Sequence, residues 1–553
     1  MRPKSKSEVP IMPGSDDRHA AKVARMLPPK SLASEEYQIW GRGRGVDIWA
    51  MICAAITGDL ETIKSLVAKD PGLINCEYEY FSPLRFAVRE NQREVVEYLL
   101  DQGADPAYEI GDSLLQLTRD RGYRELQKVF EAKLKDRHRI VPEGAAVAAA
   151  IKAGDVAEAR SLLEANPELI HAADERGNQP IHWAVMTRQI GLIDFLLDRG
   201  ADINAVRPDG LRPLHITNGD YHYRGWRDVP ATALQRHEVL IGYLLARGAQ
   251  YDISTATKIG DLQRVRELLD ENPGLISQAP PYSYYTGLPL RNAAGAGHME
   301  IVRLLLDRGA DPNQPEPGIA PHGGALHAAI GGKHYAIVKL LLEHGANPNA
   351  EVESSGNCML MARHVGAPQE IVELIASYGG SWSADLADVS TLAAMLRANP
   401  QLSVGERLDN RQIMELLLRY KPDILRQSPD PSAWWDGFIP NTPEYARWLM
   451  DHGLDPNRRN WLGITYLHRC AAKGDIEIAK VFLERGADIN AIETDYSSTP
   501  LGWAARDGRK EMVRWLLNQG ADPDLPDDEA WARPHEWAKR KGHDEIVGLL
   551  GRG

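Results

Sequence analysis

A short phrase recurs along this chain of 553 residues: Gly-Ala-Asp or Gly-Ala-Asn, followed two residues later by Asn or Asp. It begins at Gly200, Gly309, Gly345, Gly486 and Gly520. Neighbouring copies lie 36 residues apart at 309 and 345, and 34 residues apart at 486 and 520. A phrase that returns at such a period predicts an array of similar units that stack on one another, without one central core.

Each unit carries the pattern of two short helices. In residues 461–494, the first helix would run up to Gly474, which can adopt the left-handed conformation that ends helices. Asp475 can then cap a second helix, which would end before Gly486. Neither helix is long enough to be stable alone. Each must therefore bury its apolar face against the next unit.

A four-residue element precedes the first helix of several units. It reads Gln-Pro-Ile-His at 179–182, Arg-Pro-Leu-His at 212–215 and Gly-Ala-Leu-His at 324–327. With the period and the Gly-Ala-Asp phrase, it resembles the Thr-Pro-Leu-His element of the ankyrin-repeat family, in the form of a bacterial-type multi-repeat array. The resemblance covers about residues 46–553.

The resemblance implies an all-α solenoid of about 15 helix-turn-helix units with short β-hairpin-like fingers. It implies that the histidine of the element holds its turn through hydrogen bonds, which we expect of His182, His215, His327 and His468. Arg291 takes the place of this histidine in one unit. The function implied is that of a protein–protein interaction scaffold, which binds through the concave surface formed by fingers and first helices.

The expected domain order is a disordered tail followed by blocks of repeats. Residues 1–44 form a basic tail rich in Pro, Ser, Lys and Arg, with little periodic apolar content. The blocks that follow are 45–142; 143–252, with an insertion at about 217–231; 253–383; a degenerate stretch at 384–460; and 461–553, which ends in a C-terminal cap.

The formal net charge of −13 bears on the kind of partner. Binding to nucleic acid requires clustered Lys and Arg to neutralise phosphates, so we expect no nucleic-acid partner. An acidic array attracts other proteins with a basic or mixed-charge surface. We expect a monomer.

Four cysteines without metal-ligand spacing argue against a disulfide framework or a zinc cluster. The N-terminal residues lack the apolar region of a secretory signal, and no apolar stretch is long enough to span a membrane. We therefore expect a soluble protein in the cytoplasm, with no membrane partner.

Aromatic residues in the fingers and in the insertion are the candidate partner-binding residues, because exposed Tyr and Trp anchor many interfaces. The alternative is that they pack on neighbouring fingers and stiffen the array. The candidates are Tyr78, Tyr80, Phe81, Tyr221, Tyr223, Trp226, Tyr282, Tyr284, Tyr285, Trp461, Tyr496 and Trp531.

No catalytic, cofactor-binding or metal-binding residue is predicted, and no cofactor. The common phosphate-binding, metalloprotease and hydrolase motifs are missing from the sequence. Asp220, His222 and Asp228 lie close together in the insertion, but one histidine in a loop is weak support for a metal site. Two alternatives stay open: a secreted effector that binds host proteins, and an enzyme with a site in residues 384–460 or in the insertion.

Overall fold

The structure is a computed structural model that divides into two compact units. Unit 1 combines residues 1–105 and 111–127 with residues 384–553, and unit 2 consists of residues 106–110 and 128–383. The described residues are 17–38, 41–107, 113–220, 223, 225–234, 236–278, 287–316, 320, 322–352, 356–381, seven positions between 411 and 426, 440–527 and 529–551.

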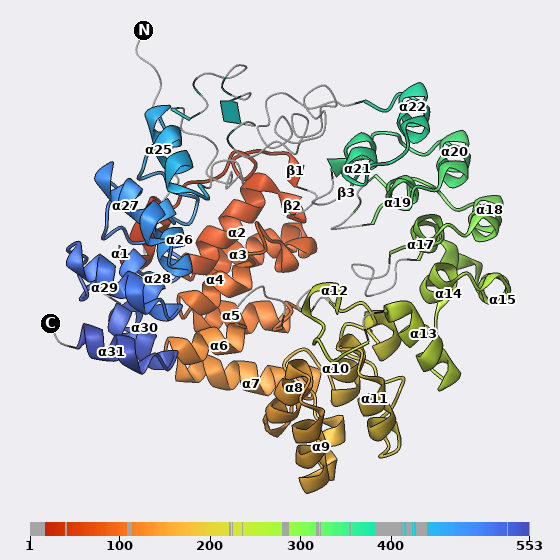
Figure 1. The fold of residues 1–553 in the computed structure, drawn as a ribbon, viewed down its shortest axis with the longest axis horizontal. Coiled ribbons are helices and arrows are strands. Elements are labelled where there is room, and N and C mark those ends of the chain that lie inside the picture. Colours follow the sequence, from red (N-terminus) through yellow and green to blue (C-terminus); the bar gives the residue numbers. More distant parts are fainter. Residues whose placement is uncertain are drawn as a thin grey trace. The chain divides into compact units, whose positions relative to one another are not determined.

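Unit 1 contains helix pairs from both ends of the sequence (Figure 1). Its N-terminal elements are α1 (Asp17–Arg25), β1 (Tyr37–Gln38), β2 (Gly43–Arg44), α2 (Gly45–Thr57), α3 (Leu60–Lys69), α4 (Pro83–Arg89), α5 (Arg93–Asp101), α6 (Leu114–Asp120) and the start of α7 (Arg124–His138). Its C-terminal elements are α25 (Pro443–Asp451), α26 (Tyr466–Lys473), α27 (Ile476–Glu484), α28 (Pro500–Arg506), α29 (Lys510–Asn518), η7 (Ala530–Ala532), α30 (Pro534–Arg540) and α31 (Asp544–Leu550).

Unit 2 repeats the same pairing of helices. Its main elements are α8 (Ala145–Ala153), α9 (Val156–Ala165), α10 (Pro180–Met186), α11 (Ile190–Leu197), η4 (Pro213–Ile216), α12 (Gly225–Asp228), α13 (His237–Ala246), α14 (Ile253–Ile259), α15 (Leu262–Glu271), η5 (Pro273–Ile276), α17 (Pro289–Ala296), α18 (Met299–Asp307), α19 (Ala325–Gly331), α20 (Tyr335–Glu343), β3 (Glu351–Val352), β4 (Gly356–Asn357), α21 (Cys358–His364) and α22 (Gln369–Ser377).

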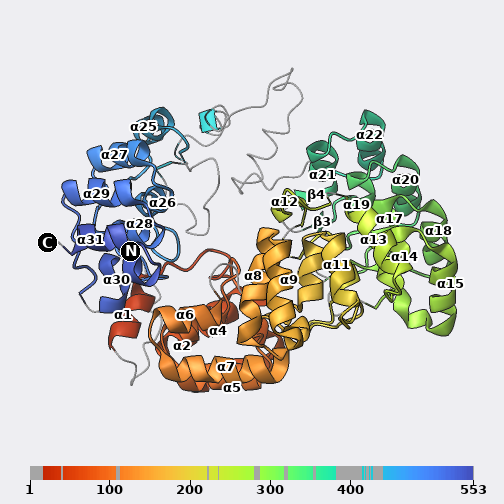
Figure 2. The same ribbon diagram turned by 60° about the horizontal axis from the view of Figure 1, so that its bottom comes forward.

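Each pair buries its apolar face against the next pair, as expected. In unit 1, first helices α26, α28 and α30 lie side by side in both views (Figures 1 and 2). One apolar cluster runs through these pairs and includes Phe482 and Leu516. The fingers between pairs are short hairpins such as β3–β4, or single antiparallel bridges such as Tyr78 with Phe81. The predicted all-α solenoid with short fingers is confirmed.

The predicted ends of the two helices in residues 461–494 are confirmed, but the predicted capping bond of Asp475 is not formed. Gly474 ends α26 with φ of +86°, a conformation that glycine adopts without strain. Asp475 stands at the N-cap of α27 but its side chain accepts no capping bond. The corresponding Asp155 does cap α9, by accepting a hydrogen bond from the backbone N–H of Glu158 at 3.0 Å.

The turn-holding role of the histidines is borne out at three positions. Nδ1 of His182, His215 and His468 accepts a hydrogen bond from the backbone N–H three residues earlier, at 3.2, 3.1 and 3.2 Å. Burial lowers the pKa of His468 to about 3, so the ring is neutral and the accepting nitrogen is unprotonated. His327 is also buried.

Replacing His468 by alanine is expected to lower the free energy of unfolding of unit 1 by about 1–3 kcal/mol. The buried backbone groups that bond its ring would lose their hydrogen-bond partner. The ring bonds both Thr465 and, at 3.2 Å, the carbonyl oxygen of Ser498 in the next unit. Urea denaturation measures the change. An H468N variant, which keeps a polar side chain, should lose less; equal losses would contradict the hydrogen-bond role.

One expectation about a segment needs correction. Residues 17–44, predicted to be disordered, contain α1 and the β1–β2 hairpin. The buried residues of α1 include His19 and Lys22. Because these buried residues are polar, the helix lacks the periodic apolar pattern by which a helix is recognised in sequence. The boundaries of the repeat blocks stay a prediction, and residues from the first and last blocks belong to one compact unit, unit 1. Most of the degenerate stretch 384–460 lies outside the described residues, apart from α25 and a few positions.

Candidate functional site

A cluster of aromatic rings joins the first finger of unit 1 to the finger before α26. The ring of Trp461 lies 5.3 Å from that of Tyr78, 5.5 Å from Phe81 and 5.9 Å from Phe86. Its Nε1 donates a hydrogen bond to Glu79 at 2.6 Å. Trp461 has 0% of its surface exposed. It is therefore not a surface anchor in this structure, and packing between fingers accounts for it.

The finger that packs against Trp461 ends in a two-residue turn with unfavourable backbone angles. Tyr78 and Phe81 pair as an antiparallel bridge, so Glu79 and Tyr80 form a two-residue turn. Both turn residues have positive φ, +49° and +69°, a conformation that favours Gly or Asn and strains other residues. The contacts of Glu79 and its neighbours with Trp461 help to hold this strained turn.

Two other candidates in unit 1 are half-buried. Tyr496 lies edge-on to Trp503 and Trp537, with ring centroids 5.6 and 5.7 Å apart. Trp531 carries the guanidinium of Arg121 over its ring, 4.4 Å from the centroid. These contacts are internal to unit 1, and a role in partner binding stays a prediction for Tyr496, Trp531 and the half-buried Tyr80.

The insertion in unit 2 packs on the repeat before it. The ring of Tyr223 lies 5.4 Å from that of Trp183, edge-on. Asp220 is buried and pairs with Arg207 at 2.9 Å, and it accepts the backbone N–H of Tyr223 at 2.8 Å. Burial raises the pKa of the Tyr223 hydroxyl to about 12. The insertion lies between η4 and α13, as expected, and these bonds fix part of it against the array.

Five candidates fall outside what the structure describes. They are Tyr221, Tyr282, Tyr284, Tyr285 and the side chain of Trp226. Their roles stay predictions.

A buried ion network in unit 1, called here the terminal network, joins its N-terminal and C-terminal helix pairs. At its centre, Nζ of Lys22 lies 2.8 Å from Oε2 of Glu90 and 2.7 Å from Oε1 of Glu529. The three side chains are 3%, 1% and 5% exposed. Charges this deeply buried are stable only when paired.

Arginines extend the terminal network beyond Lys22. Arg89 donates to Oε1 of Glu90 at 2.8 Å, and Arg85 lies 3.5 Å from Asp495. Arg121 donates to the backbone oxygen of Asp495 at 2.6 Å and also to that of Arg89. Nearby, Lys541 pairs with Asp120 at 2.9 Å. No sequence pattern reveals this network, since its N-terminal and C-terminal members are hundreds of residues apart.

The charged neighbours of Glu90 lower the pKa of its carboxyl group. Burial by itself would raise the pKa of Glu90, but the charges of Arg89, Lys22 and Arg121 together lower it to about 2. Glu90 is therefore ionised at neutral pH, as its two ion pairs require.

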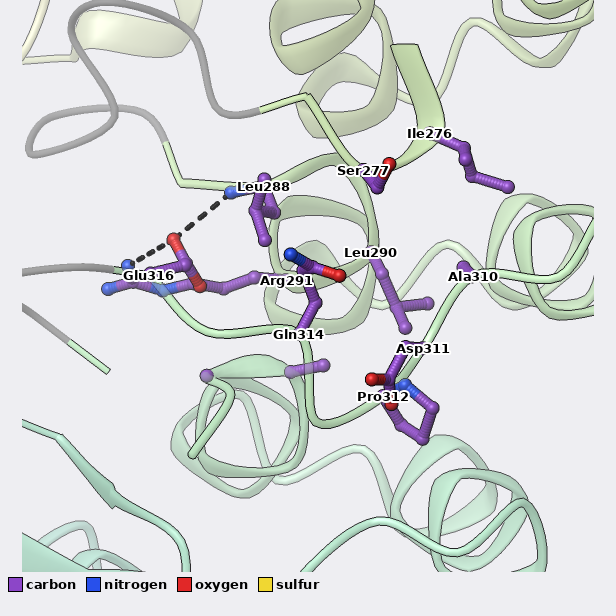
Figure 3. A pocket seen from close by; sticks show the side chains of 12 residues that line it. Ile276, Ser277, Leu288, Leu290, Arg291, Ala310, Asp311, Pro312, Gln314 and Glu316 are labelled. Atoms are coloured by element: carbon purple, nitrogen blue, oxygen red, sulfur yellow. Dashed lines mark hydrogen bonds and ion pairs between the residues drawn. The ribbon is translucent and has the colours of Figure 1, made fainter. Parts of the chain in front are cut away.

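A small hollow opens between two successive fingers of unit 2 (Figure 3). It is shallow: the space within and directly above it is about 300 Å³, a volume that includes open solvent. Apolar side chains line it together with Arg291, Gln314 and Glu316, and Figure 3 shows Gln314 lying between Arg291 and Leu290. A hollow this shallow does not bury a small-molecule substrate as an enclosed binding cavity would.

Arg291 and Glu316 form the polar side of the hollow. Oε2 of Glu316 lies 3.1 Å from Nη1 of Arg291 and accepts the backbone N–H of Leu288 at 3.1 Å. Glu316 is 1% exposed and Arg291 is 27% exposed. Arg291 thus pairs with a carboxylate at the position where other units carry the turn histidine.

A search of the described residues found no group of three or more His, Cys, Asp or Glu that could hold a metal ion. Within the same residues, no helix is both long and apolar enough to cross a membrane.

Family models for ankyrin repeats match most of the chain. A model for three ankyrin repeats matches residues 40–109, 253–352, 293–386, 438–527 and 467–551, which together cover more than half of the sequence. A single-repeat model matches 176–207. The chain belongs to the ankyrin-repeat family.

Relatives of this ankyrin-repeat chain match only segments of it. A segment of 110 residues is 31% identical to the palmitoyltransferase Hip14 of Drosophila melanogaster, covering 19% of this chain and 16% of that protein. A segment of 145 residues is 27% identical to human transient receptor potential cation channel subfamily A member 1, covering 26% and 12%. A segment of 194 residues is 28% identical to the probable E3 ubiquitin-protein ligase XBOS32 of Oryza sativa subsp. japonica, covering 30% and 38%.

The chain thus spans less than two fifths of the length of these three relatives. All three are eukaryotic, so they lend no support to the expected bacterial type of array. The similarity concerns the ankyrin repeats, and the activities in the relatives' names belong to those proteins.

Proposed function

We propose that this ankyrin-repeat chain is a protein-binding scaffold, and that the fingers and first helices of unit 2 bind the partner. The hollow beside Gln314 carries the proposal (Figure 3). It offers apolar walls and one charged pair in a small space, the kind of pocket that takes a side chain of a partner.

The chemistry of the hollow supports a polar partner side chain. Arg291 keeps part of its guanidinium surface exposed beside the buried Glu316. The chain as a whole is acidic, with a net charge of −13, which favours approach of a basic or mixed-charge protein. We infer a monomeric protein acting in the cytoplasm, without nucleic acid or cofactor.

Replacing Gln314 by tryptophan is expected to fill the hollow and weaken partner binding at least tenfold, since a bulky side chain would occupy the partner's place. The full-length chain is used to capture proteins from a cell extract with mild cross-linking. Each captured protein is then purified, and its dissociation constant is measured against the wild type and the variant by isothermal titration calorimetry.

The matched control is Arg303→Trp. Arg303 is exposed on α18, the second helix of the same repeat, and its replacement adds the same side chain away from the hollow. Binding that survives Q314W, or that R303W weakens equally, would contradict the proposed surface. A chain that binds no purified protein would contradict the scaffold function itself.

A further inference from the structure

Helix α1 stands outside the helix pairs of unit 1. It precedes the first pair, α2 with α3, and it contacts α2. Its buried positions are His19 and Lys22, continued by Met26 just after the helix. Arg18 and Arg25 are exposed. The helix therefore docks through one face whose centre is a charged side chain.

Lys22 occupies a site that two distant repeats build together. Glu90 follows α4, and Glu529 directly precedes η7. One ammonium nitrogen lies within 2.8 Å of both carboxylates. If Lys22 left, Glu90 would keep its pairing with Arg89, but Glu529 would lose its ion pair with Lys22 in a buried setting. A buried carboxylate without a partner is costly, so Glu529 would then favour the binding of another cation.

We propose that Glu90 and Glu529 form a lysine-binding site, and that α1 is a dissociable ligand which a lysine-bearing helical segment of another protein replaces. The site lies in unit 1 and is separate from the hollow of unit 2, so this inference goes beyond the proposed scaffold surface.

The geometry favours lysine over arginine. A compact ammonium group can donate to two carboxylates from one nitrogen, whereas the planar guanidinium is suited to two parallel bonds with one carboxylate. The ammonium nitrogen of Lys22 donates one hydrogen bond to Glu90 and one to Glu529, the arrangement that suits lysine.

The size of α1 makes it dissociable. A helix of nine residues is not stable alone in water, so release and unfolding occur together. Its attachment depends on ion pairs and a few side chains, while the repeats keep their own apolar cores. Segments fixed in this way open at a lower free energy than the rest of a protein.

A labelled peptide with the sequence of residues 17–32 tests the site through fluorescence anisotropy. The binding protein is the full chain with Lys22→Glu, which places a like charge beside Glu90 and Glu529 and releases α1. The control chain carries Arg25→Glu, the same charge change at an exposed position of the helix. We expect the peptide to bind the K22E chain at least tenfold more tightly than the R25E chain.

Variants of the peptide and of the site make the assignment specific. A K22M peptide should bind the K22E chain at least tenfold more weakly than the unchanged peptide, whereas an R25M peptide should bind within twofold. Adding Glu529→Gln to the K22E chain should also weaken binding at least tenfold. Equal binding of the K22M peptide, or binding unaffected by E529Q, would overturn the proposal.

Hydrogen exchange of the wild-type chain gives a second test that needs no variant to fold. Amides of α1 should exchange at least tenfold faster than those of α4 and α28, because α1 opens alone. If α1 exchanged at the same rate as those helices, it would be an integral part of the fold, and the proposal would be wrong.

Discussion

Replacing Glu90 by alanine is expected to lower the free energy of unfolding of unit 1 by about 3–5 kcal/mol, the loss that follows when one partner of a buried ion pair is removed. The change leaves Lys22 and Arg89 buried beside each other without their shared carboxylate. Urea denaturation followed by tryptophan fluorescence measures the loss. Most of the 13 tryptophans lie in unit 1, so the signal reports mainly on that unit.

An exposed ion pair provides the control for Glu90. Glu61 pairs with Lys64 at 2.9 Å, but its side chain is 85% exposed. E61A should change the free energy of unfolding by less than about 1 kcal/mol, because exposed pairs contribute little. Similar losses for E90A and E61A would show that the terminal network does not hold unit 1 together.

The pH dependence of stability gives an independent check on Glu90. Its pKa falls from an ordinary value of 4.5 to about 2 in the folded chain. Glu90 therefore stabilises the folded state fully above pH 4.5, and this contribution is lost as the pH falls from there towards 2. The difference in free energy of unfolding between the wild type and E90A should shrink across that range.

Replacing Trp461 by alanine is expected to lower the free energy of unfolding of unit 1 by about 3–5 kcal/mol, the range observed for removal of large buried aromatic side chains. The variant loses the ring contacts with Tyr78, Phe81 and Phe86 and the bond to Glu79. The strained turn at Glu79 and Tyr80 would also lose its support. Urea denaturation is again the measurement.

The conservative variant W461F separates these effects. It keeps an aromatic ring but removes the donor to Glu79, so its loss should be smaller, about 1–2 kcal/mol. In a double-mutant cycle, Y78A and W461A should show a coupling energy of at least about 0.5 kcal/mol, as residues in contact do. Strict additivity would mean that the contact between the two fingers contributes nothing to stability.

The repeat architecture could be predicted from the sequence because its signals are local. The turn histidines bond a backbone group three residues away, as at His182, and glycines such as Gly474 end helices at fixed places. A period near 33 residues preserves both signals along the chain. The position of α1 could not be predicted from local signals, because its buried Lys22 donates hydrogen bonds to carboxylates 68 and 507 residues away.

The same limit applies to the candidate site residues. Trp461 looks like an interface anchor in sequence, since it is an aromatic residue in a finger between two helix pairs. Its partners, Tyr78 and Phe81, come from a finger more than 370 residues earlier, and nothing in a single sequence pairs them. The pairing of Arg291 with Glu316 is closer in the chain. The sequence marked Arg291 only as a replacement for histidine.

The division of unit 1 between both ends of the sequence has a consequence for synthesis. A ribosome that has reached residue 440 has produced the described helices of unit 2, but neither Trp461, which packs on Phe86, nor Glu529, which pairs with Lys22. At about 5–20 residues per second, the missing part takes on the order of 10 s to emerge. During that interval Phe86 lacks the ring of Trp461 and Lys22 lacks the carboxylate of Glu529, so the first repeats of unit 1 cannot complete their packing.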